Sequence, residues 1–168
     1  MNEILILGAG YAGMAATAGL VGRLKHRDDV HITIVNPQTQ FTERLRLYQI
    51  ASGQALADLQ IPAQLDGTGV DFVEGWVTGI DAATQTVRVD DTGILHYDTL
   101  VFALGSVTDT ETVPGVGEFA YTLNTAQDAS LLACYLDRLA NGTVVEAGGG
   151  LTGVESAAEI AEIGRAHV

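Results

Sequence analysis

Two glycine-rich runs carry residue types and a spacing that suit phosphate chemistry. GAGYAG at residues 8–13 follows the apolar stretch 3–7, and GGGLTG at residues 148–153 follows the apolar stretch 143–145. In this spacing the first glycine allows a tight turn, the second lets the backbone approach a pyrophosphate, and the third lets a helix pack closely on a strand. The helix N-terminus then stabilises negative charge without a basic side chain. Two such runs predict two nucleotide sites, although a turn that only packs a helix on a sheet has the same pattern.

Each run needs a strand before it and a helix after it. The first unit predicts a strand at 3–7, a helix at 11–26 and a strand at 30–35, which together make a right-handed βαβ crossover. Before the second run, a helix over 126–139 with Asn124 or Thr125 as its N-cap leads to a strand over 143–147.

Between these units the pattern changes to short strands separated by turn signals. Asp91-Thr92-Gly93 predicts a hairpin turn. The apolar run 99–104 predicts a buried central strand. The other short strands predict an antiparallel meander, and they are 70–74, 76–80, 86–90 and 94–97.

Composition narrows the class of protein. At 168 residues and 47% hydrophobic content the chain has enough apolar material for a core. A net charge of −13 argues against a nucleic-acid or anionic-lipid surface, which needs clustered Lys and Arg. The single Cys134 excludes an internal disulfide and fits a reducing, cytoplasmic setting. Because Cys134 lies in the middle of a predicted helix among leucines, we expect it to be a buried apolar residue with no redox role. No metal site is expected, because His26, His31 and His96 lack ligand spacing.

The order of the motifs resembles the flavoproteins with two dinucleotide-binding domains, and most closely the type II NADH dehydrogenases, which are FAD-dependent NADH:quinone oxidoreductases. The resemblance covers residues 2–162, and its markers are ILILGAGYAG, NPQTQFTERLRLYQIASG, YDTLVFALGS, VPGV and GGGLTGVESAAEIAE. It implies an α/β fold: a Rossmann-like FAD-binding domain over 1–113, with a parallel sheet and an antiparallel β-meander, followed by an incomplete, Rossmann-like NADH-binding domain over 114–162.

The resemblance also implies a set of site residues. NADH or NADPH would bind Gly148, Gly150 and Gly153, with Glu155 as the catalytic residue close to the nicotinamide and flavin rings. Glu155 in the first turn of a helix is equally well explained as compensation of the helix dipole. FAD contacts are implied for a larger set, namely Gly8, Gly10, Tyr11, Ala12, Gly13, Asn36, Arg44, Val77, Ala103, Leu104 and Gly105.

Four positions leave questions open. Arg44 and Arg46 both suit a pyrophosphate, but a solvated salt-bridge face is expected for at least one of them. Asn36 stands near the adenosine ribose where the family has an acidic residue, so we expect weaker FAD binding, because charge-assisted hydrogen bonds are roughly twice as strong as neutral ones. Glu146 falls in the predicted strand 143–147, where a carboxylate is costly unless paired, and nothing in the sequence explains it.

The implied function is hydride transfer from NAD(P)H to FAD and electron transfer on to a quinone or similar acceptor. Two alternatives stay open. One is another reductase of the superfamily, such as a ferredoxin reductase or a sulfide:quinone reductase, the latter disfavoured by a single Cys. The other is a nucleotide-binding module without turnover.

The C-terminal region departs from the resemblance. A complete second βαβ unit takes about thirty residues or more, so the sequence is expected to be a truncated gene and the fragment itself inactive. Residues 163–168 match a translated sequencing adapter and are expected to be an artefactual tail, the alternative being a natural helix that ends at Gly164. Quinone binding, membrane association at the cytoplasmic face and homodimer formation would belong to the full-length parent.

Overall fold

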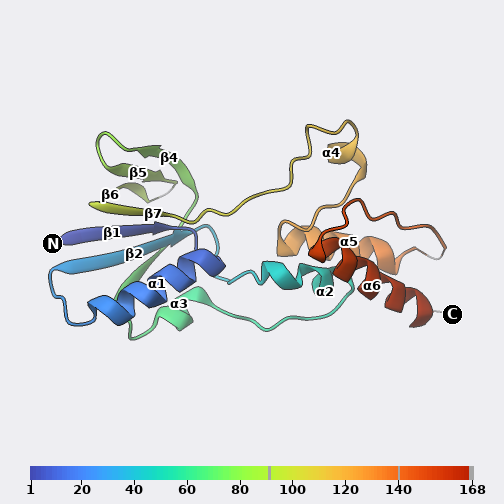
Figure 1. Ribbon diagram of the computed structural model, residues 1–168, viewed down its shortest axis with the longest axis horizontal. Helices are drawn as coiled ribbons and strands as arrows, with labels where there is room; N and C mark the ends of the chain where they lie inside the picture. Colours follow the sequence, from blue (N-terminus) through green and yellow to red (C-terminus); the bar gives the residue numbers. More distant parts are fainter. Residues whose placement is uncertain (91, 140, 167–168) are drawn as a thin grey trace. The chain divides into compact units, whose positions relative to one another are not determined.

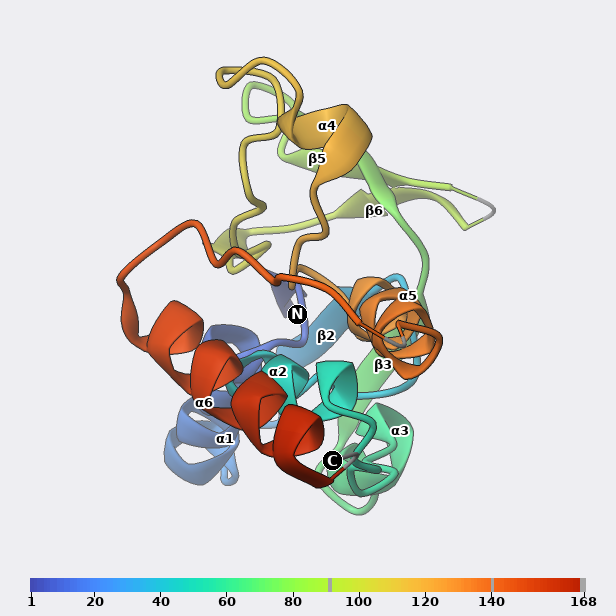
Figure 2. The same ribbon diagram turned by 90° about the vertical axis from the view of Figure 1, so that its right-hand side faces the viewer.

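The computed structural model describes residues 1–90, 92–139 and 141–166. The chain divides into two compact units. The first contains Met1–Phe41 and Asp58–Ser106, and the second contains Thr42–Ala57 and the chain from Val107 onward. Figure 1 labels most of the elements of both units, and β3 is labelled in Figure 2.

The first unit is built on a four-stranded parallel sheet. Its strands are β1 (Asn2–Leu7), β2 (Val30–Asn36), β3 (Val70–Glu74) and β7 (Thr99–Phe102), in the order β3-β2-β1-β7. Leu7 pairs with Val35 of β2 and with Phe102 of β7, so these three strands reach the same edge of the sheet together. The helix α1 (Tyr11–Leu24) connects β1 to β2, which confirms the predicted βαβ unit.

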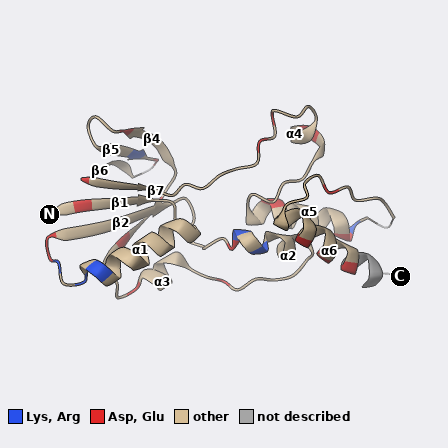
Figure 3. Cartoon of the chain, in the orientation of Figure 1, with Lys and Arg blue, Asp and Glu red and all other residues tan. Residues whose placement is uncertain are grey.

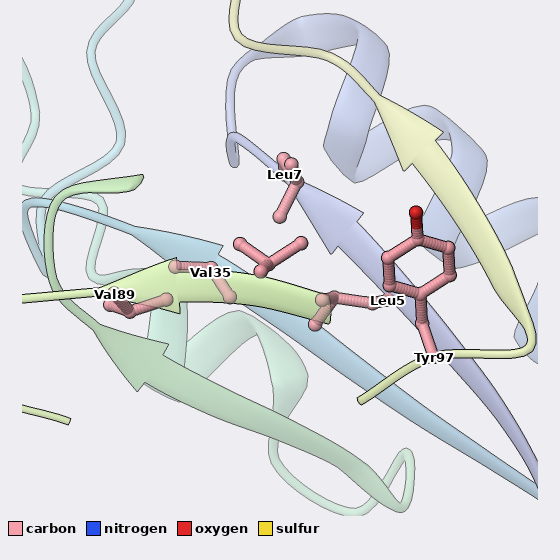
Figure 4. Close-up of a cluster of buried hydrophobic side chains, with 6 residues drawn as sticks. Leu5, Leu7, Val35, Val89 and Tyr97 are labelled. Atoms are coloured by element: carbon pink, nitrogen blue, oxygen red, sulfur yellow. The ribbon is translucent and has the colours of Figure 1, made fainter. Parts of the chain in front are cut away.

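Side chains that alternate along the strands fill two separate cores. Ile6, Ile32 and Ile34 pack with residues of α1 and of the short helix α3 (Ile61–Leu65). On the opposite face, Leu5, Leu7, Val35, Val89 and Tyr97 form the cluster drawn in Figure 4. Because both faces are covered, the strands are apolar on both sides, as parallel strands commonly are.

The second face is covered by a small antiparallel sheet, as the sequence predicts. Its strands are β4 (Val77–Asp81), β5 (Thr86–Val89) and β6 (Gly93–His96), in that order. Of the predicted hairpin turn, Asp91 lies outside the described residues, while Gly93 has a φ of 99° and begins β6.

Two strand predictions were wrong. Residues 70–74 form β3 of the parallel sheet instead of a strand of the meander, because β3 pairs in parallel with β2. The run 99–104 is not a central strand: β7 lies at an edge of the sheet, pairs with β1, and leaves Phe102 66% exposed. An apolar run indicates burial of faces, but it carries no information on how many strands flank it.

The regular secondary structure of the second unit is helical over the described residues. It contains the 3₁₀ turn η1 (Arg44–Arg46), α2 (Leu47–Ala51), α4 (Val116–Phe119), α5 (Ala126–Asp137) and α6 (Leu151–Ala166). Leu47 and Ala51 of α2 pack against Ala129 of α5. Figure 2 views the same helices after a 90° turn.

The N-cap of α5 is Thr125, one of the two predicted candidates. Its hydroxyl oxygen accepts from the Asp128 N–H at 3.1 Å, and the Asp128 carboxylate accepts from the Thr125 N–H at 3.1 Å, which completes a capping box. The helix ends at Asp137, two residues before the predicted end. Cys134 is exposed, so the prediction that it is buried was wrong.

Residues 143–147 do not form the predicted strand. They are extended without strand pairing in the described part of the chain, and Val145 is 82% exposed. A strand needs a ladder partner as well as β-branched residues, and the local sequence supplies only the latter. Glu146 is exposed as well, so the burial penalty expected for its carboxylate does not arise.

Candidate functional site

The first glycine loop joins β1 to α1 at the carboxyl edge of the parallel sheet. Gly8 has a φ of 94°, a conformation that side chains other than glycine rarely adopt. A Cβ on Gly8 would also lie less than 3.0 Å from the carbonyl oxygen of Ala103 and 3.2 Å from the Cα of Leu104. The fold therefore brings the loop against the segment that follows β7, two of the stretches that the sequence analysis assigned to one site.

Gly13 and Gly10 differ in what surrounds them. A Cβ on Gly13 would overlap the carbonyl oxygen of Gly8, so only glycine lets the first turn of α1 sit on the loop. A Cβ on Gly10 would meet nothing within 4 Å. The second glycine thus faces open space, as it must if a ligand is to approach the backbone there.

The N-terminus of α1 is open to an anion. Gly10 is the N-cap and makes no side-chain capping hydrogen bond, and the first turn contains no acidic residue. The first N–H groups of the helix therefore have no competing capping group from a side chain, and the helix dipole is not offset by a carboxylate in that turn.

Tyr11, the first residue of α1, is held by an aromatic contact that the sequence analysis did not foresee. Its ring meets that of Phe41 edge-on, with centroids 5.1 Å apart and planes at 90°. Phe41 is fixed in turn because its N–H donates to the carbonyl oxygen of Leu59 at 2.8 Å. The long-range pairing between the chain near residue 40 and the chain near residue 60, together with packing of Phe41 against the core around Ile34, positions this ring, and neither has a local sequence signal.

Asn36, at the end of β2, lies beside the first loop. Its Oδ1 accepts from the N–H of Ala9 at 3.0 Å, and its Nδ2 donates to the carbonyl oxygen of Gln38 at 2.8 Å. Its backbone carbonyl accepts from the N–H of Gly75 at 3.0 Å. Both ends of the side-chain amide are therefore engaged by the protein itself.

The remaining residues assigned to the first site lie in two places. Val77 begins β4 and packs against the cluster of Figure 4, and Gly105 follows β7 with a φ of 75°. Arg44 lies in η1 of the second unit. Its neighbour Arg46 has the expected salt-bridge environment, with Nη1 3.3 Å from a carboxylate oxygen of Glu43 and Nε donating to Gln49 at 2.8 Å.

The second glycine loop repeats the geometry of the first. Gly148 has a φ of 140°, and a Cβ on Gly153 would overlap the carbonyl oxygen of Gly148. A Cβ on Gly150 would meet nothing within 4 Å. The loops differ at their first glycine. A Cβ on Gly148 would meet nothing within 4 Å, whereas a Cβ on Gly8 would overlap the carbonyl oxygen of Ala103.

Glu155 is the fifth residue of α6 and is partly exposed. The first turn of α6 contains no acidic residue, so the alternative that Glu155 compensates the helix dipole from that turn was wrong. One turn further on, the carboxylate of Glu159 accepts from Nε2 of Gln54 at 2.8 Å.

Charged groups at the opposite end of the parallel sheet form a separate network. Nδ1 of His31 lies 2.8 Å from a carboxylate oxygen of Glu3, and Nε2 lies 3.0 Å from one of Asp71. Hydrogen bonding to Glu3, and then to Asp71, raises the pKa of His31 above its ordinary value, although partial burial opposes the shift. In the described part of the chain no group of His, Cys, Asp and Glu side chains is arranged to hold a metal ion.

Basic residues are few in this chain, which has 8 Lys and Arg against 21 Asp and Glu. Neither glycine run contains Lys or Arg. Figure 3 shows Lys and Arg on few elements, such as the end of α1 and η1, and acidic residues spread over both units. Among the described residues, no helix is both long and apolar enough to cross a membrane.

Comparisons with known proteins agree with this geometry. The family model described as pyridine nucleotide-disulphide oxidoreductase matches residues 2–168. An NADH dehydrogenase-like protein of Mycobacterium tuberculosis is 33% identical over 99% of the chain, and the type II NADH:quinone oxidoreductase of Staphylococcus saprophyticus is 28% identical over 96%. The crystal structure of NADH:rubredoxin oxidoreductase from Clostridium acetobutylicum matches 96% of the chain and 42% of its own, with 27% identity and a TM-score of 0.76. The chain spans 44% and 43% of the two sequence relatives.

Proposed function

Because the chain belongs to the pyridine nucleotide-disulphide oxidoreductase family, we propose that it is part of an FAD-dependent oxidoreductase. Hydride passes from NAD(P)H to FAD, and electrons pass on to a quinone or a similar acceptor. The observation that carries the proposal is the repeated glycine geometry, in which Gly13 lies on the carbonyl oxygen of Gly8 and Gly153 on that of Gly148. Two loops of this kind suit two nucleotides, one that donates hydride and one that receives it.

The residues of the first loop fit FAD. Gly10 leaves room for a pyrophosphate, and the uncapped N-terminus of α1 offers N–H groups to it. FAD, when bound, supplies the hydride acceptor. The chain supplies orientation through proposed contacts of the first unit that comprise Gly8, Gly10, Tyr11, Ala12, Gly13, Val77, Ala103, Leu104 and Gly105. Asn36 supports this loop from the end of β2, and Arg44 is proposed as a further contact from the resemblance alone.

The second loop is proposed to bind NAD(P)H through Gly148, Gly150 and Gly153. The open space at Gly150 supports this assignment, as at Gly10. Glu155 follows the loop by two residues and is partly exposed, so its carboxylate is available to a bound nicotinamide. The proposed domains remain 1–113 for FAD and 114–162 for NAD(P)H.

One of the two sequence relatives supports a quinone as the proposed acceptor, because the Staphylococcus saprophyticus protein is named as a type II NADH:quinone oxidoreductase. A redox protein is the second candidate, supported by the likeness to NADH:rubredoxin oxidoreductase. We further propose, from the resemblance, that the whole protein is cytoplasmic, associates peripherally with the membrane and forms a homodimer.

Nucleotide titrations of loop variants test the proposal. Gly10→Val fits the apo fold, because Gly10 has an extended backbone and open space around its Cβ position. We expect this variant to lose FAD binding, measured by quenching of flavin fluorescence, and to keep NADH binding. Gly150→Val should do the reverse.

Gly149→Val is the matched control for the second loop, because a Cβ at Gly149 also meets nothing within 4 Å and the residue is not one of the three motif glycines. NADH binding that is equal in Gly150→Val and Gly149→Val would contradict the assignment of the second loop. FAD binding that survives in Gly10→Val would contradict that of the first.

A further inference from the structure

The side-chain amide of Asn36 makes two hydrogen bonds, one through its oxygen as acceptor and one through its nitrogen as donor. Oδ1 accepts from the Ala9 N–H at 3.0 Å, in the middle of the first glycine loop, and Nδ2 donates to the Gln38 carbonyl at 2.8 Å. The partners fix the orientation of the amide, because a backbone N–H can only donate and a carbonyl can only accept. Asn36 therefore ties the loop after β1 to the segment after β2.

An acidic residue cannot replace Asn36 in this arrangement. An ionised carboxylate has two acceptor oxygens and no donor. One oxygen would still serve Ala9, but the other would face the carbonyl oxygen of Gln38 where Nδ2 now donates. An acid would need to rotate away or displace residues 36–38, and either movement disturbs the contact with Ala9.

Two backbone hydrogen bonds fix the end of β2, from which the side chain of Asn36 reaches Ala9. The N–H of Gly8 donates to the carbonyl of Val35 at 2.8 Å, and the N–H of Gly75 donates to the carbonyl of Asn36 at 3.0 Å. The end of β2 is thus fixed on both sides, so the amide of Asn36 holds Ala9 from a rigid support. With the N–H groups of Gly8 and Ala9 engaged, the N–H groups that remain for an anion are those from Gly10 onward, at the start of α1.

We propose that Asn36 is a positioning residue that holds the first glycine loop in its nucleotide-binding conformation through both ends of its amide, and that it is not a weakened form of an acidic ribose ligand. The inference rests on the proposed function for the identity of the nucleotide. The two interpretations of Asn36 predict opposite effects of restoring an acid at this position.

Asn36→Asp and Asn36→Ala separate them. If Asn36 were a weakened ribose ligand, Asn36→Asp would tighten FAD binding by adding a charge-assisted hydrogen bond. As a loop-positioning residue, Asn36 makes both substitutions harmful, and we expect the FAD dissociation constant to rise by about tenfold in each. Asn36→Ala loses both side-chain hydrogen bonds and leaves the partly buried N–H of Ala9 without its acceptor, whereas Asn36→Asp loses the bond to Gln38 and sets a carboxylate oxygen against that carbonyl.

Two control variants isolate the effect. Asn2→Asp adds the same charge at the exposed start of β1 and should leave the FAD dissociation constant unchanged. Ile34→Val removes a methylene group from a fully buried side chain of β2 that packs in the same cluster as Ala9, which lowers stability but leaves the hydrogen bonds of Asn36 in place, and should also leave the FAD dissociation constant unchanged. A fall in FAD affinity in Ile34→Val equal to that in Asn36→Ala would mean that the effect is only one of stability and would overturn the proposal.

Hydrogen exchange of the Ala9 amide in the flavin-free chain tests the contact independently of FAD. We expect exchange in Asn36→Ala to be at least about tenfold faster than in the wild type, because the acceptor is gone, and unchanged in Asn2→Asp. Tighter FAD binding in Asn36→Asp, or unchanged Ala9 exchange in Asn36→Ala, overturns the proposal. If the wild-type chain binds no FAD, the proposed function fails, while the exchange of Ala9 still decides the role of Asn36.

Discussion

The carbonyl oxygen of Gly8 occupies the place where a side chain of Gly13 would begin. A Cβ on Gly13 would lie less than 3.0 Å from that oxygen, and the same is true of Gly153 and the oxygen of Gly148. The third glycine of each motif is thus required by the backbone of the first, whereas the second glycine has open space around it through which a ligand can approach.

This relationship predicts different costs for neighbouring substitutions. Gly13→Ala should lower the free energy of unfolding by about 3 kcal/mol, because the new methyl group meets rigid backbone and overpacking of this kind costs 1–3 kcal/mol or more. Gly10→Ala, with open space around it, should change the free energy by less than about 0.5 kcal/mol. Urea unfolding measures both. Equal stability of the two variants would show that α1 does not sit on the loop as described.

The network of His31 predicts a pH-dependent stability. Since the pKa of His31 is raised in the fold, its contribution is fully present below the unfolded value of about 6.5 and is lost as the pH rises through the higher folded value. His31 is about one third exposed, so the loss should not exceed about 1 kcal/mol.

Urea unfolding of the wild type and of His31→Gln at pH 6 and pH 8.5 checks this effect of pH. The wild type should lose more stability over this interval than the variant. Asp71→Asn should differ from the wild type in the same direction as His31→Gln but by less, because the hydrogen bond between His31 and Glu3 remains. An identical pH dependence in wild type and His31→Gln would contradict the network.

Exposure of Cys134 predicts rapid modification. A thiol reagent should label the native chain at a rate within a few-fold of the rate in 8 M urea, since the residue lies on the open face of α5. Cys134→Ser should leave FAD binding unchanged, because the chain has a single Cys and no partner for a disulfide. Labelling that requires unfolding would show that α5 packs differently.

The capping box at the start of α5 predicts a modest and local cost. Thr125→Ala removes the oxygen that accepts from the Asp128 N–H and should lower the free energy of unfolding by about 1 kcal/mol. Thr143→Ala, at an exposed position outside the helices of the same unit, is the comparison. If Thr125→Ala is no more destabilising than Thr143→Ala, the box does not support α5.

The sequence predicted the parts of the fold that depend on neighbours in the chain. The strand, glycine loop and helix around residues 3–24 follow from local apolar patterning and from the spacing of three glycines, and the N-cap of α5 was narrowed to Asn124 or Thr125. Features that depend on distant partners were missed. The run 99–104 has the composition of a central strand, yet β7 has one neighbour.

The same distinction holds for the candidate site. The glycines of both loops were identifiable because their role is a matter of backbone geometry. The engagement of Asn36 with Ala9 and Gln38, and the contact between Tyr11 and Phe41, depend on how β2 and the segment after it return to the loop. Sequence patterns indicate residue types at such positions, but they do not indicate which hydrogen-bonding groups are already engaged.

The flavin content of three chains tests whether the first glycine loop binds FAD. Wild type, Gly10→Val and Gly19→Val are saturated with FAD, freed of unbound flavin by gel filtration, and compared by visible absorbance. Gly19 lies in α1 and, like Gly10, has nothing within 4 Å of its Cβ position, so it controls for the added side chain. We expect about one FAD per chain in the wild type and in Gly19→Val and almost none in Gly10→Val. Equal flavin in all three, or none in the wild type, would contradict it.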